Sequence, residues 1–596
     1  MLKHKDMKKL FLLVVSIICV QEISSLSSPW SWECINEACV KKETQPGQEE
    51  KAISLEACQI FCSEESGLWP KPNGVINVSK ILVPVDPSLI EINTRRLGSL
   101  TSEAAKLFKE ELIRRAPTAR DVGDKGKPLS INIFHTEPDT DKLTLETDES
   151  YNLVTGIDDK GKLQVNITAP NFFGSRHALE TLGQLIIYDD LRNQLKTPIF
   201  LNITDKPAFP YRGILLDTAR NYISVDAIKK TINGMAASKL NTFHWHITDS
   251  HSFPYVSKSR PQLSQYGAYS PRKVYSQKDI EDIVDFAKVR GVRVMPEFDA
   301  PAHVGEGWQK TGYVVCLNAQ PWGTYCVEPP CGQFDVTKDG LYDALEDIYG
   351  DMVEQFDPDI FHMGGDEVHF TCWNQTKSII AWMAQKGWGR EEEDFAKLWG
   401  YFQDTAADRL FKKVGKNIPV IMWTSTLTKK EHVTKYLPKD KYIIQIWTLG
   451  NDPQISELLE EGYKLILSNY DALYLDCGFA GWVTDGNNWC SPYIGWQKVY
   501  DNKPKSIAGS RINQILGSEA ALWSEQVDST SVDSRLWPRA AAMAETLWSD
   551  PSNTWREAET RFLIHRERLV RRGLDADALE PEWCLQNENE CPIKKV

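Results

Sequence analysis

The sequence lacks an excess of positive charge and, after its first twenty residues, contains no long hydrophobic segment. Lysine and arginine number 68 against 82 aspartate and glutamate residues, which gives a formal net charge of -14 at pH 7. An acidic surface repels phosphate backbones and anionic headgroups, so nucleic acid and membranes are excluded as main partners and a neutral or cationic substrate is favoured. No later segment reaches the roughly 20 apolar residues that a membrane-spanning helix requires.

The N-terminus has the pattern of a secretion signal. Basic residues Lys3, Lys5, Lys8 and Lys9 precede an apolar run over 10–20 and small residues over 24–28. Because that run is too short to cross a bilayer, a cleaved signal peptide over 1–23 is favoured over an uncleaved anchor. The sequence therefore predicts a secreted, extracellular protein, with the lysosome as the alternative destination. Triplets for N-glycosylation agree with this route and begin at Asn77, Asn166, Asn202 and Asn374.

The cysteine count fits an oxidising compartment. Of 13 cysteines, Cys19 leaves with the signal, and the even number that remains predicts six disulfides. No CxxC pair repeats, which argues against the rival interpretation of a zinc site. The expected arrangement sets Cys34 and Cys39 against Cys58 and Cys62, forms local clamps between Cys326 and Cys331, Cys477 and Cys490, and Cys584 and Cys591, and leaves Cys316 for Cys372. The connectivity stays open at this point.

A chain of 596 residues predicts more than one domain. We expect a disulfide-stapled segment over 24–70, followed by a small α+β domain over 71–205. That domain alternates β-rich runs (130–134, 151–155 and 162–168) with helical runs (102–115 and 174–187). The segment Asp205-Lys206-Pro207 marks the expected boundary to a catalytic domain over 206–596.

The catalytic domain shows a βα rhythm that predicts an α/β fold, a (β/α)8 TIM barrel. Eight β-branched and apolar runs alternate with helical stretches, and they cover 213–217, 242–247, 292–297, 360–363, 420–423, 443–447, 465–469 and 515–522. Barrel enzymes place their active sites at the carboxyl ends of the strands. Polar or aromatic residues follow every run, in order Arg220, Asp249, the stretch 297–303, the stretch 364–367, Trp423, Trp447, Tyr474 with Asp476, and Trp523 with Glu525.

The adjacent pair Asp366 and Glu367 is the most conspicuous of these groups. Neighbouring strand residues point to opposite faces, so both acids face the barrel mouth only if the strand ends there. Gly364 and Gly365 supply the backbone freedom for such a turn. Two close carboxylates push their pKa values apart, so that one can donate a proton while the other stays ionised. This chemistry suits cleavage of a glycosidic bond; a solvated surface pair is the alternative.

The stretch 362–368 (HMGGDEV) resembles the signature of the family twenty glycoside hydrolases, the β-N-acetylhexosaminidases. The similarity continues through 212–220 (RGILLDTAR), 241–249 (NTFHWHITD), 296–303 (PEFDAPAH) and 522–525 (LWSE). It covers residues 70–580 and shows no departure at a catalytic position. In this family the 2-acetamido group of the substrate is the nucleophile, and the reaction passes through an oxazolinium ion with retention.

The resemblance implies a role for each polar residue at the strand ends. Glu367 is the general acid and then the base, Asp366 orients the acetamido nitrogen, and Tyr474 donates to the acetamido oxygen. Arg220 and Glu525 grip the terminal non-reducing sugar, which makes the enzyme exo-acting. Asp249 and His303 support the catalytic acid, although a histidine that serves only the core is the alternative. Asp476 joins the substrate-binding set.

Aromatic residues are expected to line the sugar subsites. Trp423, Trp447 and Trp523 fall at strand ends, whereas Trp489, with Trp482 nearby, lies in the loop between Cys477 and Cys490. Similarity to insect chitin-degrading members implies that Trp489 stacks on the sugar beyond the cleavage point, with Val327 and Glu328 beside it. The expected substrates are chitooligosaccharides that end in N-acetylglucosamine, with N-acetylgalactosamine as a second terminal sugar and N-glycans or glycolipids as alternatives.

Two rival functions remain. His244 and His246 form an HxH pair that, with His303, would suit a metal-dependent hydrolase, but Trp423 and Trp447 end strands where further ligands are needed. An inactive carbohydrate-binding homologue would lose an acid, and both acids are present. We therefore expect an enzyme without metal or cofactor. The family resemblance also implies a homodimer.

Overall fold

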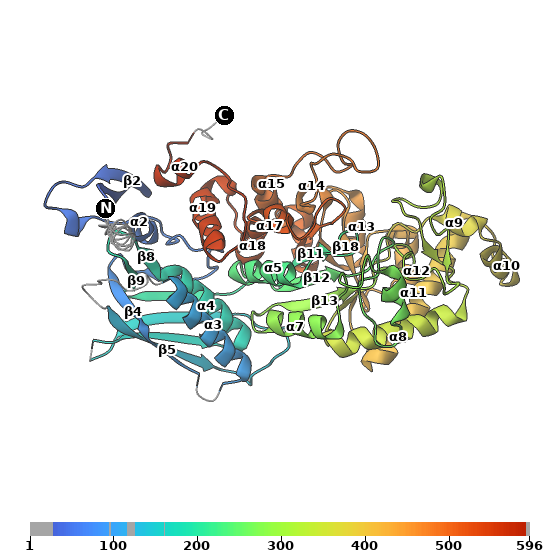
Figure 1. The fold of residues 1–596 in the computed structure, drawn as a ribbon, viewed down its shortest axis with the longest axis horizontal. Coiled ribbons are helices and arrows are strands. Elements are labelled where there is room, and N and C mark those ends of the chain that lie inside the picture. Colours follow the sequence, from blue (N-terminus) through green and yellow to red (C-terminus); the bar gives the residue numbers. More distant parts are fainter. Residues whose placement is uncertain (1–27, 95–96, 116–125, 160, 592–596) are drawn as a thin grey trace, which may run out of the picture.

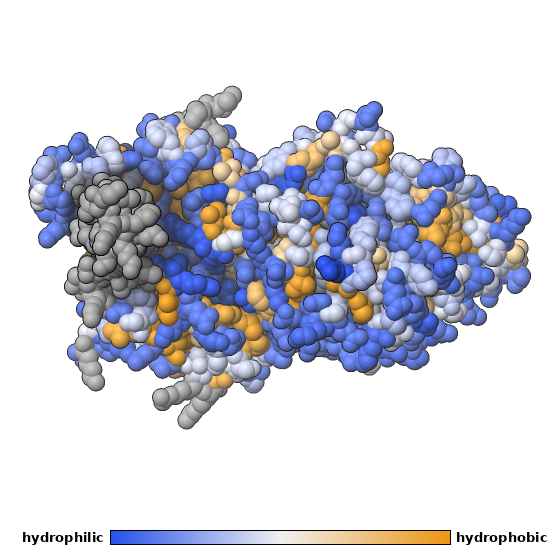
Figure 2. Space-filling model, viewed as in Figure 1, coloured by the Kyte–Doolittle hydropathy of each residue, from blue (hydrophilic) through white to orange (hydrophobic). Residues whose placement is uncertain are grey.

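The computed structural model describes residues 28–94, 97–115, 126–159 and 161–591. The predicted signal peptide lies outside the described residues. No helix in the described part of the chain is both long and apolar enough to cross a membrane. The face of the molecule in Figure 2 is mostly hydrophilic, with its apolar residues in small separate patches.

The N-terminal segment is a small stapled unit. The hairpin β1 (Trp30–Ile35) and β2 (Ala38–Glu43) packs against η1 (Glu49–Lys51) and α2 (Leu55–Cys62). Disulfides Cys34–Cys62 and Cys39–Cys58 connect the hairpin to α2, and their sulfurs and neighbours form a small core of their own. A segment this short cannot bury a sufficient hydrophobic core, so the disulfides hold it together.

The next domain is an eight-stranded mixed sheet covered on one face by two helices (Figure 1). Its strands, in spatial order, are β3 (Ile76–Val78), β10 (Leu201–Asp205), β6 (Tyr151–Ile157), β7 (Leu163–Ala169), β5 (Lys127–His135), β4 (Leu82–Asn93), β9 (Gln194–Pro198) and β8 (Ile187–Asp189). In β7 the apolar residues alternate with exposed polar ones, as expected for a sheet with one open face. Helices α3 (Ser99–Arg115) and α4 (Phe172–Leu185) cover the apolar face.

The predicted helix over 174–187 is wrong at its C-terminal end. The helix stops at Leu185, Ile186 adopts an extended conformation, and Ile187 begins β8. Two successive β-branched isoleucines favour extended structure over another helical turn, because they lose side-chain freedom in a helix.

The catalytic domain is a closed parallel barrel, which confirms the predicted fold class. Its strands are β11 (Tyr211–Asp217), β12 (Thr242–His246), β13 (Arg293–Glu297), β16 (Phe361–His362), β17 (Val420–Trp423), β18 (Tyr442–Ile446), β19 (Lys464–Leu467) and β20 (Ile515–Leu522). Each overlaps one of the eight predicted runs. Nearly every strand residue is buried, because helices cover the outer face of the barrel and side chains fill its interior.

Helices and short loops surround the barrel. The helices are α5 (Val225–Ala237), α6 (Gln262–Gly267), α7 (Gln277–Lys288), α8 (Asp339–Phe356), α9 (Phe370–Gln375), α10 (Lys377–Gln385), α11 (Glu392–Val414), α12 (Lys430–Tyr436), α13 (Pro453–Glu461), α14 (Tyr470–Leu473), α15 (Trp496–Asp501), α16 (Pro504–Ala508), α17 (Val532–Leu536), α18 (Arg539–Ser549), α19 (Trp555–Arg571) and α20 (Glu582–Gln586). The loops include the pair β14 (Val314–Val315) and β15 (Gln333–Phe334), and the 3-10 turns η2 (Trp322–Thr324), η3 (Thr426–Thr428) and η4 (Gly509–Gln514).

The barrel interior changes from apolar to polar along its axis. An apolar cluster at the strand starts, which includes Tyr211, Met295 and Ile443, closes the lower end. Above it lie buried polar groups such as His244 and Glu519, whose Nδ1 and Oε1 atoms are 2.8 Å apart. The polarity therefore rises toward the carboxyl ends of the strands, where chemistry is expected.

A buried ion pair joins the two domains. Glu149, just before β6, accepts two hydrogen bonds from the Arg212 guanidinium of β11, at 2.9 and 2.6 Å. His177 of α4 and Asn241 also contact this carboxylate, at 2.8 and 3.1 Å. Burial alone would raise the pKa of Glu149, but Arg212 and His177 outweigh burial and lower the pKa to about 2. The boundary between the domains is thus held by charge as well as by apolar contact.

We predict that Glu149→Gln destabilises the fold, because it leaves Arg212 buried without a counter-charge. The expected loss is about 3–5 kcal/mol in the free energy of unfolding, measured by urea denaturation near pH 7. Glu354→Gln removes a carboxylate from an exposed pair with Lys258 and should change stability by less than about 1 kcal/mol. Since the folded-state pKa of Glu149 is depressed, its contribution is complete above the unfolded pKa of roughly 4.3 and disappears as the pH falls toward 2. Equal losses in both variants would contradict this assignment.

Candidate active site

A tight turn after β16 carries the adjacent acids. Gly364 and Gly365 have φ values of 61° and 81°, and Glu367 has a φ of 51°. A Cβ atom on Gly364 would lie 1.9 Å from Asp299 Oδ1, and one on Gly365 would lie 2.4 Å from the Met422 methyl group. Only glycine fits both positions, because they combine left-handed backbone with close neighbours.

Hydrogen bonds fix this turn on both sides. The Gly364 N–H donates to His362 Nδ1 at 3.0 Å, and the Gly365 N–H donates to Asp299 Oδ1 at 2.8 Å. The Gly364 carbonyl accepts from the Trp423 N–H of the next strand at 3.0 Å. The turn therefore brings both Asp366 and Glu367 to the barrel mouth, although adjacent residues of a straight strand would face opposite sides.

A chain of charged contacts leads to the catalytic pair. His303 Nε2 lies 3.1 Å from Glu367 Oε2 and 4.0 Å from Asp366 Oδ1, while its Nδ1 lies 3.1 Å from Asp249 Oδ2. Asp249 in turn pairs with Arg220 at 3.0 Å. Of the two acids Glu367 is the more open, with a side-chain exposure of 22% against 13% for Asp366. Sequence analysis predicted the association of Asp249 and His303 with Glu367, and the structure brings these three side chains together.

Burial and neighbouring charges shift the pKa values of Asp366 and His303. Burial raises the pKa of Asp366 to about 6, with Glu367 and Glu297 adding to the rise and His303 opposing it. Burial would lower the pKa of His303, but Asp249, Asp299 and Asp366 outweigh it and hold that pKa well above its usual value. His303 is therefore a cation between two carboxylates at neutral pH.

Arg220 is the centre of a second acidic group. Its guanidinium lies 3.4 Å from Asp217, 3.0 Å from Asp249 and 2.8 Å from Glu328. Burial raises the pKa of Glu525 well above its usual value, against the lowering effect of Arg220. Arg220 Nε is buried and makes no hydrogen bond, so one donor remains for a ligand. Asp476, below Trp523, has its pKa raised to about 7 mainly by burial.

Aromatic rings form a wall beside the acids. Trp523 contacts the rings of His246, Trp423 and Tyr474, with centroids 5.0, 6.0 and 6.1 Å apart. Trp423 is only 1% exposed, and its indole N–H donates to Glu297 at 2.9 Å, so it offers little open face. Burial raises the pKa of Tyr474 well above its usual value, and the charge of Asp366 adds to this rise.

Trp489 extends this wall toward solvent. It is 66% exposed and contacts Tyr470, Tyr474 and Trp447 at centroid distances of 5.0, 6.2 and 6.4 Å. The disulfide Cys477–Cys490 closes the loop that carries it. Trp482, on the same loop, contacts His251 at 6.0 Å and is half-exposed. The loop thus presents an aromatic surface outside the buried site.

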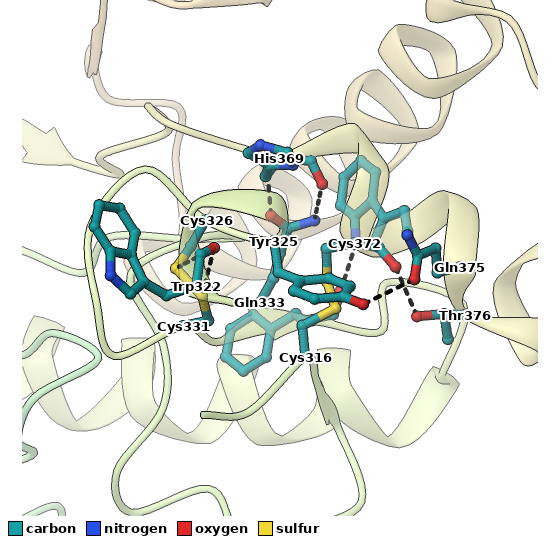
Figure 3. The surroundings of a disulfide bond; sticks show 12 residues. Cys316, Trp322, Tyr325, Cys326, Cys331, Gln333, His369, Cys372, Gln375 and Thr376 are labelled. Carbon is teal, nitrogen blue, oxygen red and sulfur yellow. Dashed lines mark hydrogen bonds between the residues drawn. A yellow bond between two sulfur atoms is a disulfide. The ribbon is translucent and has the colours of Figure 1, made fainter. Parts of the chain in front are cut away.

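Two disulfides shape the loop on the opposite side of the mouth (Figure 3). Cys316–Cys372 ties the long loop after β13 to α9, and Cys326–Cys331 closes the short turn that contains Val327 and Glu328. The amide of Gln333 brackets the backbone of His369, accepting from its N–H at 2.9 Å and donating to its carbonyl. The exposed Val327 and the Arg220-bound Glu328 are held at the rim as a result. The sixth disulfide, Cys584–Cys591, lies far from the mouth in the C-terminal segment.

Sequence analysis did not single out Glu297 as an individual site residue, although it lies at the centre of the site's polar floor. Its carboxylate contacts His246 at 2.6 Å, His244 at 3.0 Å and Trp423 at 2.9 Å. Asp217 and Asp299 were also missed. The strand-end rule contained the signal for Asp217 and Glu297, since they end β11 and β13.

The imidazoles near Glu297 differ in their pKa values. His244, Glu297 and His362 lie close enough to hold an ion. Burial would lower the pKa of His244, but Glu519 and Glu297 raise it to about 9, and Glu297 likewise raises the pKa of His246. Burial lowers the pKa of His362, whose Nε2 has no hydrogen-bond partner among the described residues. A protonated imidazole has no lone pair for a metal, so the raised pKa values of His244 and His246 disfavour these two residues as ligands.

Fold and site together define a barrel glycosidase. Residues 209–551 match the model of the glycosyl hydrolase family 20 catalytic domain, and residues 68–185 match a domain described as beta-acetyl hexosaminidase like. The chain therefore belongs to glycosyl hydrolase family 20. It is 53% identical to the chitooligosaccharidolytic beta-N-acetylglucosaminidase of Ostrinia furnacalis over 579 residues, which covers 96% of this chain and 98% of the relative. The Bombyx mori protein of the same name is also 53% identical, with 95% of each chain covered.

Solved structures agree with this assignment. A family 20 exo beta-N-acetylglucosaminidase from Vibrio harveyi, in complex with N-acetylglucosamine, superposes with a TM-score of 0.68 at 26% identity. The match covers 86% of this chain and 78% of that one.

The raised pKa of Asp366 predicts an acidic limit to catalysis. If Asp366 acts as an anion, as the family resemblance implies, kcat/KM falls as the pH drops through about 6. Replacing His303 removes the cation that lowers the pKa of Asp366, so His303→Gln should move this limb to higher pH as well as reduce the rate. The measurement is kcat/KM on a chromogenic N-acetylglucosaminide between about pH 4 and 8. His432→Gln, in α12, is the matched control and should leave the limb in place; an unmoved limb in His303→Gln would contradict the prediction.

Proposed function

We propose that this protein is an exo-β-N-acetylglucosaminidase that acts on chitooligosaccharides by a retaining, substrate-assisted mechanism. The observation that carries the proposal is the turn after β16, which brings Asp366 and Glu367 together at the barrel mouth, where the charge of Asp366 adds to burial in raising the pKa of Tyr474. Two glycosidase carboxylates that work as acid and nucleophile stand on opposite sides of the reacting bond. Adjacent acids on one turn suit a reaction in which the substrate supplies the nucleophile.

The residues at the barrel mouth have different roles in this mechanism. Glu367, the more open acid, protonates the leaving oxygen and later takes a proton from water. Asp366 accepts from the acetamido N–H and stabilises the positive charge that develops on the nitrogen. The Tyr474 hydroxyl donates to the acetamido oxygen as this oxygen attacks the anomeric carbon. His303 and Asp249 hold Glu367 in place.

The closed end of the site supports exo action. Arg220 is buried among Asp217, Asp249 and Glu328 and retains an unpaired Nε donor, while Glu525 and Asp476 stand nearby as acceptors. Such a fork and its carboxylates suit the hydroxyls of one terminal sugar and leave no passage for a continuing chain. N-acetylgalactosamine differs at a single hydroxyl and is a second terminal sugar in this proposal.

The chitooligosaccharide assignment rests on Trp489 and on the two insect relatives. Their names state activity on chitooligosaccharides, and they match this chain over nearly its full length. Trp489 offers an exposed ring face beyond the buried acids, where a second sugar would stack. Processing of N-glycans or glycolipids is the alternative, since the same buried site would serve it.

Secretion and glycosylation are part of the proposal. Asn77 and Asn166 are exposed on the open face of the N-terminal sheet, and Asn202 is the cross-strand partner of Asn77. Asn374 lies beside Arg390, which donates to its side-chain oxygen at 2.7 Å. Six disulfides fit an oxidising compartment. A homodimer remains an expectation from the family.

Glu367→Gln tests the mechanism. On a substrate with a poor leaving group, the variant should have a kcat that is lower by a factor of about 10²–10⁴. The decrease should be smaller on an aryl glycoside, because its leaving group needs no proton. Glu354→Gln, on the surface of α8, is the matched control and should keep full activity. A chelator should have no effect on the wild type. Equal losses on both substrates would count against general acid catalysis by Glu367, and an inactive wild type would favour the binding-protein alternative.

Trp489→Ala tests the substrate class. Loss of one stacking ring should reduce kcat/KM on chitobiose about tenfold, equivalent to about 1.4 kcal/mol, and leave a branched N-glycan unaffected. Trp583→Ala removes a similarly exposed ring, 57% against 66%, from α20 and should change neither rate. Equal losses on both substrates in Trp489→Ala would reject the stacking role.

A further inference from the structure

A cavity of about 480 Å³ lies where the N-terminal domain meets the barrel. Helices α3 and α4 form one wall, the ends of α5 and α7 form a second, and α19 forms a third. Figure 1 shows α3 and α4 on the side of their sheet that faces the barrel. The cavity is remote from the turn after β16, and none of the residues discussed above as part of the catalytic site lines it.

Arginine dominates this cavity. Three arginines come from the C-terminal end of α19 and the residue that follows it, namely Arg568, Arg571 and Arg572. Four more line the other walls, Arg114 and Arg115 on α3, Arg176 on α4 and Arg290 after α7. Against these seven positive charges stand three carboxylates, Glu110, Glu111 and Glu180, which leaves a formal charge of +4 in the lining. The whole chain has a net charge of -14, so this concentration of arginine runs against the overall composition.

Two of the three carboxylates of the cavity, Glu111 and Glu180, are already engaged, and Arg571 pairs with Glu56, outside the lining, at 2.7 Å. Glu180 accepts two hydrogen bonds from Arg572, at 3.0 and 2.8 Å, and lies 3.5 Å from Arg176. Glu111 pairs with Arg572 at 3.1 Å. Within the described residues, no carboxylate lies within 4.0 Å of Arg290 or Arg568. Their hydrogen bonds go to neutral groups, the Asn233 amide for Arg290 and the Gln184 amide for Arg568.

Arg115 has two donor atoms that no described residue satisfies. Its Nη1 donates to the carbonyl oxygens of Gly183 and Ile186, at 3.0 and 3.2 Å, which fixes the guanidinium. Its Nε and Nη2 are buried and make no hydrogen bond, and Glu111 is 3.9 Å from Nε. The Nε and Nη2 edge of a guanidinium is a fork that matches two oxygens of a phosphate or carboxylate. Buried donors of this kind require a partner, and none of the described residues supplies one.

Burial and neighbouring arginines also lower the pKa values of Arg568 and Arg290. Burial is the main cause that lowers the pKa of Arg568 to about 9; Glu56 and Glu180 oppose it, and Arg571 and Arg115 add to it. Burial and Arg176 together lower the pKa of Arg290 to about 10. A bound anion would reverse both effects, because an opposite charge favours the protonated guanidinium.

We infer that this cavity is a binding site for a phosphate group, free or carried by a small organic molecule. Planar guanidinium forks are the groups of choice for phosphate oxygens, and the cavity volume falls within the range of small-molecule sites. Leu107, Phe108 and Leu179 give the cavity an apolar wall beside the arginines, which suits an organic portion. The inference goes beyond the glycosidase function and does not depend on it.

Occupancy would join three parts of the chain. The arginines come from the N-terminal domain, from the end of a barrel helix and from α19, so one anion would bridge segments far apart in the sequence. Ligands that bind only the folded state raise its stability. The expected consequence is that phosphate raises the melting temperature without involving the active-site residues.

The experiment uses the full mature protein. The melting temperature is measured in chloride, in inorganic phosphate and in glucose 6-phosphate, at matched ionic strength and pH. Phosphate should raise it by about 2 °C or more over chloride. Arg290→Gln should abolish most of this rise, and Arg115→Lys, which keeps the charge but removes the fork, should weaken it. Arg556→Gln, an exposed arginine outside the cavity, is the matched control and should keep the full rise.

Each outcome decides the proposal. A rise with both phosphate compounds supports a site for the phosphate group itself, and a rise with glucose 6-phosphate alone supports a phosphate monoester. No rise with either compound overturns the proposal, and so does a rise that Arg290→Gln retains in full. If Arg115→Lys fails to fold, Arg290→Gln still decides, and tungstate soaked into crystals should give anomalous density between Arg115 and Arg290 when the site exists.

Discussion

Negative charge crowded into one small space is the constraint on which this active site depends. The barrel mouth gathers Asp217, Asp249, Glu328, Asp366, Glu367, Asp476 and Glu525, with Arg220, His246 and His303 as the positive charges among them. Three cations cannot neutralise seven carboxylates, and burial raises the free energy of every charge that remains. Burial is the largest cause of the raised pKa values of Asp366, Asp476 and Glu525, and neighbouring carboxylates add to it.

Geometry decides which of the two acids is the more open and lies closer to His303. His303 stands against Glu367 at 3.1 Å but 4.0 Å from Asp366, so the cation supports the more open acid directly. The glycine turn forces both acids into this position, since added Cβ atoms would collide with Asp299 and Met422. Backbone conformation and electrostatics are therefore linked. The turn brings the carboxylates close together, and the nearby cations offset part of their mutual repulsion.

The barrel was predictable because its strands are buried on both faces. Such strands read as continuous apolar runs, and all eight runs, including 420–423 and 515–522, correspond to barrel strands. The polar strand ends followed from the same rule. Side-chain contacts between different segments were not predictable, because no local pattern marks them: Glu149 meets Arg212 across a domain boundary, and His246 meets Glu297, its register partner on the adjacent strand.

The pKa values of the acids were the property least predictable from the sequence. The adjacent acids predicted that two pKa values would separate, but the structure places the raised value on Asp366, the more buried acid. Burial and the position of His303 decide this, and neither is a property of the motif. The end of α4 at Leu185 is a smaller example of the same limit. Ile187, two residues later, begins β8 and pairs with β9, a strand that comes later in the chain.

The two ends of the molecule have opposite charge, and this bears on the substrate. An acid-rich mouth repels sugars that carry sulfate, phosphate or carboxylate groups, because field lines from buried carboxylates extend into a cleft with low-dielectric walls. Uncharged N-acetyl sugars meet no such barrier. The arginine-rich cavity lies between α3, α4, α5 and α19, and no residue of the mouth lines it. Separation of the charges thus lets one acidic chain favour a neutral substrate at the mouth while it presents a basic cavity elsewhere.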